Sequence, residues 1–187
     1  MNREIPVRFC EGGGVRFPSA TRLVVLAKHV GTRISRFIEE TLEGWLGLAI
    51  NRDKTRVVKL GEEGSHLDFL GFTLRYECGR RPPHRRYLSL TPSRKALQRE
   101  RAVLREKTGP QTGWKAIPDL IAEMNAHLRG WANYFRLGQP RRAFWQINRY
   151  VRARLAVHLR RRSQRPLRPA EGETIYGLLA REGLVSL

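Results

Sequence analysis

Apolar residues recur at three- and four-residue steps in three successive stretches of the chain's second half. This spacing places apolar side chains on one face of an α-helix. We expect helices at about 93–107, 114–135 and 141–162, with a turn at 138–140 between the last two. A chain that must bury three such stripes at once forms a three-helix bundle.

The first part of the chain has a different pattern. Short apolar runs at 23–27, 56–60 and 67–76 are typical of strands, and GEEG at 61–64 predicts a hairpin turn between the last two. Residues 34–46 have the spacing of an amphipathic helix. Short strands and one helix, followed by a helical bundle, make the expected fold class α+β.

A polar, proline-rich break at 79–84 separates these two parts. After it, a short strand is expected at 87–90. It leads into Thr91-Pro92-Ser93, where a hydroxyl group and an early proline predict a helix start. The last residues predict one weak helix at about 175–180.

Positive charge is concentrated in the middle of the chain. Of 187 residues, 36 are Lys or Arg and 17 are Asp or Glu, a net charge of +19. Residues 1–78 have 12 basic and 10 acidic side chains, residues 79–170 have 23 and 4, and residues 171–187 have 1 and 3. An ordinary solvated surface mixes both signs. The middle segment is therefore expected to bind a polyanion, in a strongly salt-dependent way.

Several other classes of protein are disfavoured by composition. No run approaches the roughly 18–20 apolar residues that cross a bilayer, and the N-terminal residues have no apolar signal region. We expect no membrane partner and a cytoplasmic location. The two cysteines, Cys10 and Cys78, are too few for a disulfide scaffold, and with His84 they lack zinc-site spacing, so no metal site is expected.

The basic segment also contains recognisable motifs. LRGWANYFRLG (128–138) and the arginine-rich run at 141–162 resemble the maturase-specific domain of group II intron reverse transcriptases. LGLAINRDKTRVVKL, which ends at Leu60, and LDFLGFTLR (67–75) resemble the last palm blocks of that family, and SLTPSRKAL (89–97) resembles the entry into its thumb. The resemblance implies a partial reverse-transcriptase palm, with short antiparallel strands and one helix, before a mostly α-helical thumb and maturase bundle.

The same resemblance suggests a domain division. Family-like sequence starts at Leu23, so residues 1–22 are expected to be a divergent or disordered N-terminus. Residues 23–78 would be the partial palm, 79–164 the thumb and maturase-specific helical domain, and 165–187 a C-terminal tail.

The polymerase site of the family is not matched. There, a Tyr-Ala-Asp-Asp turn helps to hold the two divalent metal ions, Mg²⁺ in the intact enzyme, that carry nucleotidyl transfer. Here no aspartate lies between Met1 and Arg52, and Asp53 and Asp68 are not at the family's catalytic position. We expect no catalytic residue, no cofactor for this chain alone and no polymerisation of DNA by it.

The expected function is binding of structured RNA, group II intron RNA by resemblance, to assist splicing. Two alternatives remain open: a split reverse transcriptase that needs an N-terminal partner chain, and a basic RNA-binding protein without intron specificity. DNA is the alternative nucleic-acid partner.

The predicted RNA-binding residues are polar side chains of the basic helices. In the signature helix, Trp131 and Phe135 lie on the apolar stripe and are expected in the core, whereas Tyr134 could either stack on a base or pack between helices. The basic and amide side chains off the stripes are expected to contact phosphates or 2′-hydroxyl groups. They are Arg94, Lys95, Arg99, Arg129, Asn133, Arg136, Arg141, Arg142, Arg149, Arg152, Arg160, Arg161 and Arg162.

Two further motifs have family roles by resemblance. Phe69-Leu70-Gly71-Phe72 resembles the strand that positions the primer end, although burial of Phe69 and Leu70 in a core explains it equally well. Asn51, Lys54 and Thr55 match a motif near the nucleotide phosphates of intact family members. Without a catalytic centre, we interpret this motif as the start of a hairpin with an exposed lysine.

Overall fold

The computed structural model describes residues 24–27, 31–53, 55–79, 85–162, 169 and 171–187. The chain forms two compact units, 1–56 and 57–187, and each is considered by itself. The expected divergent N-terminus, 1–22, lies outside the described residues.

The described residues of the first unit contain one helical segment. Helix α1 (Thr32–Glu39) continues as a π-helical stretch, η1 (Glu40–Trp45), and the helix stops at Gly47, whose φ is +62°. The predicted helix at 34–46 is therefore confirmed. The strand predicted at 23–27 is wrong for its described residues, 24–27, which belong to no strand and leave Val25 and Leu26 exposed.

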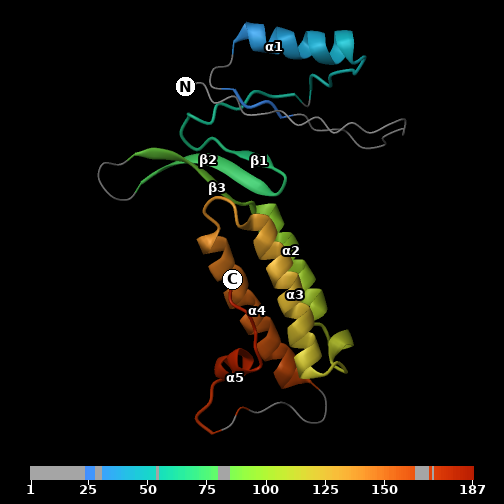
Figure 1. Ribbon diagram of the computed structural model, residues 1–187, viewed down its shortest axis with the longest axis vertical. Coiled ribbons are helices and arrows are strands. Elements are labelled where there is room, and N and C mark those ends of the chain that lie inside the picture. The colour runs from blue at the N-terminus through green and yellow to red at the C-terminus, as the bar shows by residue number, and fades with distance from the viewer. Residues whose placement is uncertain (1–23, 28–30, 54, 80–84, 163–168, 170) are drawn as a thin grey trace. The chain divides into compact units, whose positions relative to one another are not determined.

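A three-stranded antiparallel sheet opens the second unit. Strands β1 (Leu67–Phe69), β2 (Phe72–Cys78) and β3 (Arg86–Pro92) lie in the order β1-β2-β3 (Figure 1). The strand predicted at 87–90 is confirmed and extended by β3.

Two strand predictions before β3 need correction. The single strand expected at 67–76 is a tight hairpin, because Leu70 and Gly71 both have positive φ, 48° and 81°, as a two-residue turn requires. The strand expected at 56–60 is irregular instead, so the GEEG turn does not join two strands.

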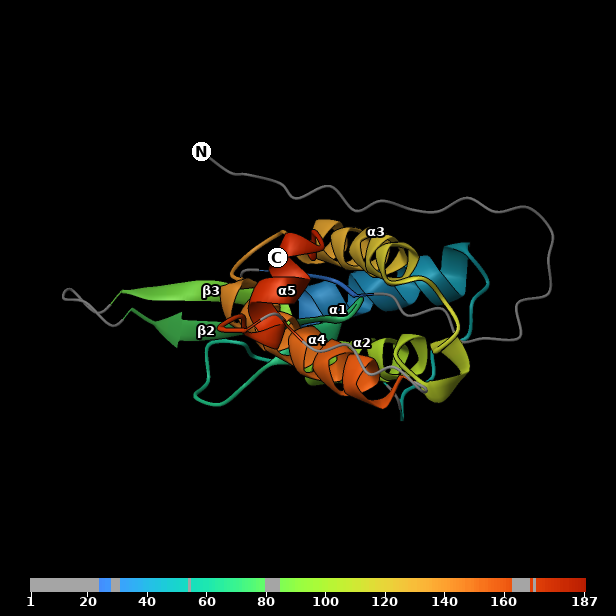
Figure 2. The same cartoon turned by 90° about the horizontal axis from the view of Figure 1, so that it is seen from below.

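Three long helices follow the sheet. They are α2 (Arg94–Lys107), α3 (Ile117–Phe135) and α4 (Arg141–Arg161), with a 3₁₀ turn, η2 (Pro110–Thr112), between the first two. Figure 2, which views the bundle along its length, shows the three helices around a common interior. The predicted bundle and fold class are confirmed. The second helix begins three residues later than expected, because Pro118 fits the first helical turn.

The bundle interior is filled by side chains from the predicted apolar stripes. Its most deeply buried apolar residues are Leu104, Leu120, Met124, Leu128, Ile147, Val151, Leu155 and Leu159. Burial of this kind stabilises a fold by about 1.5–3 kcal/mol for each large side chain. The packed core therefore fixes which helix faces remain outside.

Two turns attach the sheet to the bundle. The Ser93 side chain caps α2 at the Ala96 amide, as predicted, and the Ser93 backbone amide donates to the Gly71 carbonyl at 2.7 Å. Gln139 pairs with Leu90 of β3: its backbone amide donates to the Leu90 carbonyl at 2.8 Å, and its side-chain oxygen accepts from the Leu90 amide at 2.9 Å. The turn between α3 and α4 thus occupies part of the outer edge of β3.

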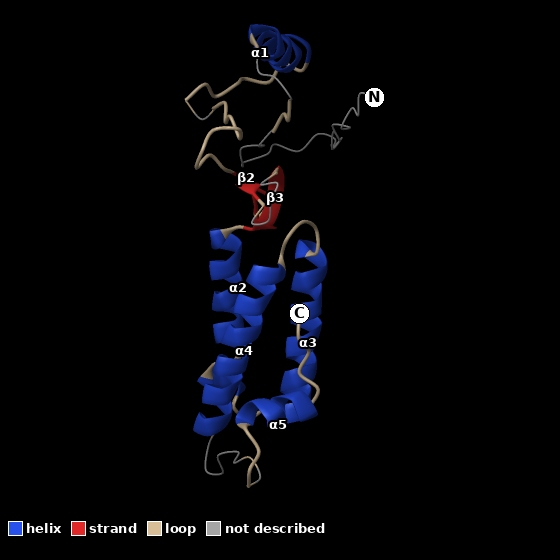
Figure 3. Cartoon of the chain, turned by 90° about the vertical axis from the view of Figure 1, so that its left-hand side faces the viewer, coloured by secondary structure: helices blue, strands red, loops and turns tan. Residues whose placement is uncertain are grey.

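A short last helix, α5 (Ile175–Arg181), confirms the helix expected at 175–180 and lies across one end of the bundle (Figure 3). The residues after it are held by two side-chain amides. Asn125 of α3 pairs with Gly183 and Val185, and Asn148 of α4 pairs with Ser186 and Leu187, at 2.8–3.1 Å. This pairing joins the tail to α3 and α4.

The family-based boundary between 23–78 and 79–164 falls inside the second unit. Strands β2 and β3 pair across it, from Phe72 with Pro92 to Cys78 with Arg86. The division at 78/79 therefore remains a proposal based on resemblance to the family, and it differs from the boundary between the two compact units.

Gly130 offers a simple test of α3. It lies exposed in the helix interior, and a β-carbon there would meet nothing within 4 Å. Glycine is about 1 kcal/mol less favourable than alanine at such a position. Gly130→Ala is expected to raise the free energy of unfolding by about 1 kcal/mol in urea denaturation. A decrease would contradict an exposed helix at this residue.

Candidate nucleic-acid interface

Acidic residues are missing from a long part of the bundle sequence. No Asp or Glu occurs between Glu123 and Glu171, a stretch that contains the C-terminal half of α3, the following turn and all of α4. Helix α4 alone contains seven arginines. Positive charge in this stretch has no acidic neighbour within its own segment.

Two of the four acidic side chains of α2 and α3, Glu100 and Glu123, are already paired, whereas Glu106 and Asp119 lie exposed. Glu123 accepts hydrogen bonds from Lys107 (2.7 Å) and Lys115 (2.5 Å), which lower its pKa to about 2. Glu100 is buried against His127 at 3.0 Å; burial raises the pKa of Glu100, and the histidine partly offsets this. Among the described residues, no arginine of α3 or α4 forms an ion pair with a carboxylate.

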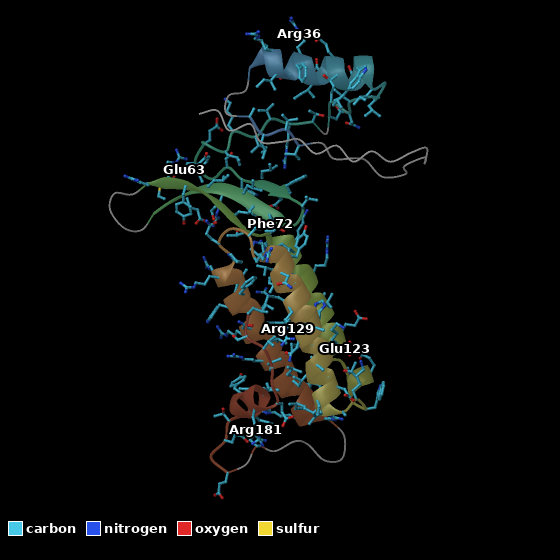
Figure 4. All side chains as sticks on the ribbon, in the orientation of Figure 1. Arg36, Glu63, Phe72, Glu123, Arg129 and Arg181 are labelled. Atoms are coloured by element: carbon cyan, nitrogen blue, oxygen red, sulfur yellow. The ribbon has the colours of Figure 1, made fainter. Side chains whose placement is uncertain are left out.

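Most of the predicted RNA-binding residues lie exposed on the bundle. Arg129 and Asn133 of α3 and Arg136, directly after this helix, are exposed (Arg129 is labelled in Figure 4), as off-stripe positions should be. The exposed members on α2 and α4 are Arg94, Lys95, Arg99, Arg141, Arg142, Arg149, Arg152, Arg160 and Arg161.

Three other arginines have structural partners. Arg162, one of the predicted set, is half-buried and donates to the Lys115 carbonyl. Arg154 donates from Nε to the Thr108 hydroxyl at 3.1 Å, and Arg101 donates to Gln146 at the same distance. These guanidinium groups hold α4 against α2 and the loop after it, so we leave them out of the candidate interface.

The signature helix divides as its stripe predicted. Phe135 is buried, and Trp131 is half-buried and packs on Phe135 and Phe144 with ring centroids 4.8 and 5.7 Å apart. Tyr134 packs on the β1–β2 hairpin rather than between helices: its hydroxyl donates to the Leu70 carbonyl at 2.9 Å, its ring stacks on Phe72 at 5.7 Å, and the residue remains 54% exposed. Stacking of Tyr134 on a base stays a prediction.

The primer-grip-like motif is the β1–β2 hairpin. Phe72 packs on Phe135 with centroids 4.9 Å apart, where the sheet meets the helices (Figure 4), and Phe69 is half-buried. Burial of Leu70 was a wrong expectation. Its position at the turn with positive φ leaves it 67% exposed.

The nucleotide-proximal motif lies in the first unit. Asn51 and Thr55 are exposed, and the Thr55 hydroxyl donates to the Asn51 carbonyl at 2.8 Å in a local turn. Lys54 lies outside the described residues. The motif's family role stays a prediction.

One exposed aromatic residue escaped the sequence analysis. Trp145 of α4 is 61% exposed, and the Arg149 guanidinium lies over its ring at 5.6 Å from the centroid. The signal for it was its position, one residue off the apolar stripe through Phe144 and Ile147, among arginines.

The parts of the chain that the structure describes contain no group of three His, Cys, Asp or Glu side chains placed to hold a metal ion. Cys78 is exposed and unpaired, whereas Cys10 and His84 lie outside the described residues. Among the described helices, none is long and apolar enough to cross a bilayer.

His158 is a buried histidine of the bundle, and its pKa is lowered. It is buried, Nδ1 lies 3.2 Å from the Thr108 carbonyl, and Nε2 has no hydrogen-bond partner among the described residues. Burial lowers the pKa of His158, and the charges of Arg162 and Arg154 lower it further, against the Thr108 hydrogen bond. The folded state therefore binds a proton at His158 less readily than the unfolded state.

Stability is expected to fall as pH drops below about 6.5, with a slope approaching 1.4 kcal/mol per pH unit from this residue. His158→Gln should remove that part of the slope in urea denaturation at pH 5 to 8. His66→Gln, which removes an exposed histidine of the same unit, is the control. An unchanged slope in His158→Gln would contradict the prediction.

Part of the chain matches a known family. Residues 97–173 match the family model described as the group II intron, maturase-specific domain. This segment begins in α2 and includes α3 and α4, so it contains most of the exposed basic residues described above. No curated protein matches the chain significantly.

Proposed function

We propose that this chain binds structured group II intron RNA and assists its splicing, because residues 97–173 match the family model of the group II intron maturase-specific domain. Exposed arginines would neutralise phosphates, and the shape of the bundle would select a folded RNA. The proposal assigns the protein no covalent chemistry.

The observation that carries this proposal is an overlap. The matched segment, 97–173, contains the whole of the stretch without acidic residues, which runs from residue 124 to 170. Apolar stripes stabilise a helical bundle, whereas a surface of unpaired positive side chains destabilises it, because like charges repel one another. An RNA backbone supplies the missing negative charge.

The polar side chains of α3 suit the shallow minor groove of an A-form RNA helix. That groove presents 2′-hydroxyl groups between two lines of phosphates. The Asn133 amide can both donate to and accept from a hydroxyl group, and Arg129 and Arg136 lie exposed on the same helix or directly after it. These three residues combine one hydroxyl-binding group with two phosphate-binding groups.

Competition binding tests the proposal. The full chain is titrated with a group II intron RNA in the presence of a scrambled, structured RNA of equal length, across a salt series. The proposal expects the intron RNA to be preferred by a hundredfold or more, which is about 2.7 kcal/mol. Equal binding, with both RNAs released together as salt rises, would instead identify a polycation without intron specificity.

A further inference from the structure

Trp145 lies within a basic strip of α4. At about 100° per residue, Arg142, Trp145, Arg149 and Arg152 fall within an arc of about 80° on the helix surface. All four are exposed, and none forms an ion pair with a carboxylate of the described residues. We call these four residues the α4 strip.

Trp145 contributes little to the packing of the bundle interior. It is 61% exposed, and the core positions on either side of it are filled by Phe144 and Ile147. Arg149 lies over the ring at 5.6 Å and orients the indole, while its own charge stays available to an anion. An exposed, oriented aromatic ring between cations is the arrangement that stacks on a nucleobase beside its phosphates.

We propose that Trp145 stacks on an unpaired nucleobase of the bound RNA, while Arg142, Arg149 and Arg152 contact the phosphates on either side. The ligand of this strip is then RNA with a bulge or loop, because the bases of a continuous A-form duplex are stacked on one another and inaccessible to the indole. The inference rests on the proposed RNA binding and names the RNA feature that this site selects.

The chain provides a matched control. Trp114 is even more exposed, at 80%, but it lies in the turn before α3, where the neighbouring Lys115 is paired with Glu123. Trp114 therefore presents an exposed aromatic ring without the neighbouring exposed arginines that Trp145 has in the α4 strip. Trp114→Ala therefore removes an equal amount of indole from a site where no stacking is proposed.

The test compares two RNA hairpins whose strands are joined by a non-nucleotide linker, so that neither has a nucleotide loop, and which differ only by a two-nucleotide bulge. Their dissociation constants are measured at one salt concentration for the full chain, Trp145→Ala, Trp145→Phe and Trp114→Ala, and circular dichroism checks each fold. We expect the full chain to prefer the bulged hairpin about tenfold. Trp145→Ala abolishes that preference with less than a twofold effect on the paired hairpin, Trp145→Phe retains part of it, and Trp114→Ala keeps all of it.

Two results would overturn the inference alone. One is equal binding of both hairpins by the full chain, and the other is an unchanged preference in Trp145→Ala; RNA binding itself survives in both. An equal loss of the preference for the bulged hairpin in Trp114→Ala would also overturn it, because the preference would then not depend on the position of the indole. Failure of the full chain to bind either hairpin would overturn the proposed function together with this inference.

Discussion

Alanine at position 138 is expected to lower the free energy of unfolding of the 57–187 unit by about 3 kcal/mol. Gly138 has a φ of +81°, where an alanine residue is strained by about 1 kcal/mol. Its β-carbon would also lie 2.2 Å from the Leu90 carbonyl oxygen, well inside van der Waals contact. The turn must therefore move away from β3.

That movement breaks the pairing between Gln139 and Leu90. Two hydrogen bonds, of 2.8 and 2.9 Å, are made there, and each contributes about 1 kcal/mol. With the backbone strain, the sum is about 3 kcal/mol. The measurement is urea denaturation followed by circular dichroism.

Gly172→Ala is the matched control for this prediction. Gly172 has nearly the same φ, +82°, but a β-carbon there would meet nothing within 4 Å. It should lose about 1 kcal/mol, from strain alone. Equal losses in the two variants would mean that the contact with Leu90 contributes nothing to stability.

The helices were predictable because their signal repeats many times within one element. In α4, Ile147, Val151, Leu155 and Leu159 recur at four-residue steps, and all are buried. Several successive positions therefore agree, and neither propensity nor a neighbouring element can easily override them. The exposed arginines follow from the same stripe, because they are the positions off it.

The strands were predicted less well because a short apolar run does not identify its partner. Residues 56–60 have the composition of a strand yet pair with no other described segment. The turn at Leu70 was missed for another reason. A leucine with positive φ is uncommon, and its conformation is supported by distant residues: Tyr134 binds its carbonyl, and Phe135 packs against Gly71.

Within the candidate interface, the sequence could not distinguish exposed arginines from those that form hydrogen bonds within the protein. Arg162 and Arg160 look alike in a basic run, but only the former reaches a carbonyl of the turn before α3, at Lys115. The Gln139–Leu90 pairing likewise joins residues 49 positions apart. Such contacts depend on the packing of whole helices, which a local pattern does not contain.

Neutralising three arginines of the α4 strip is expected to have the largest effect on RNA binding. In the triple variant R142Q/R149Q/R152Q, three phosphate contacts are lost. Each contact contributes roughly 0.7–0.9 to the slope of log affinity against log salt. The slope should therefore become shallower by about 2–3, and affinity near physiological salt should fall about 100-fold.

Stability should hardly change in this variant, because all three side chains are exposed and glutamine has a helix propensity close to that of arginine. Filter binding of a structured RNA across a salt series measures both quantities. The control, R33Q/R36Q/R56Q, makes the same change in net charge at exposed arginines of the first unit.

The comparison of the two triple variants separates a placed interface from a general electrostatic attraction. A net positive charge acts over long distances and is blind to position, so it would make both variants lose affinity alike. Direct phosphate contacts are local, so only the α4 variant would show the shallower salt slope. Equal losses of RNA affinity in the two variants would mean that net charge accounts for the binding. Helix α4 would then not be the interface, even if group II intron RNA were still the ligand.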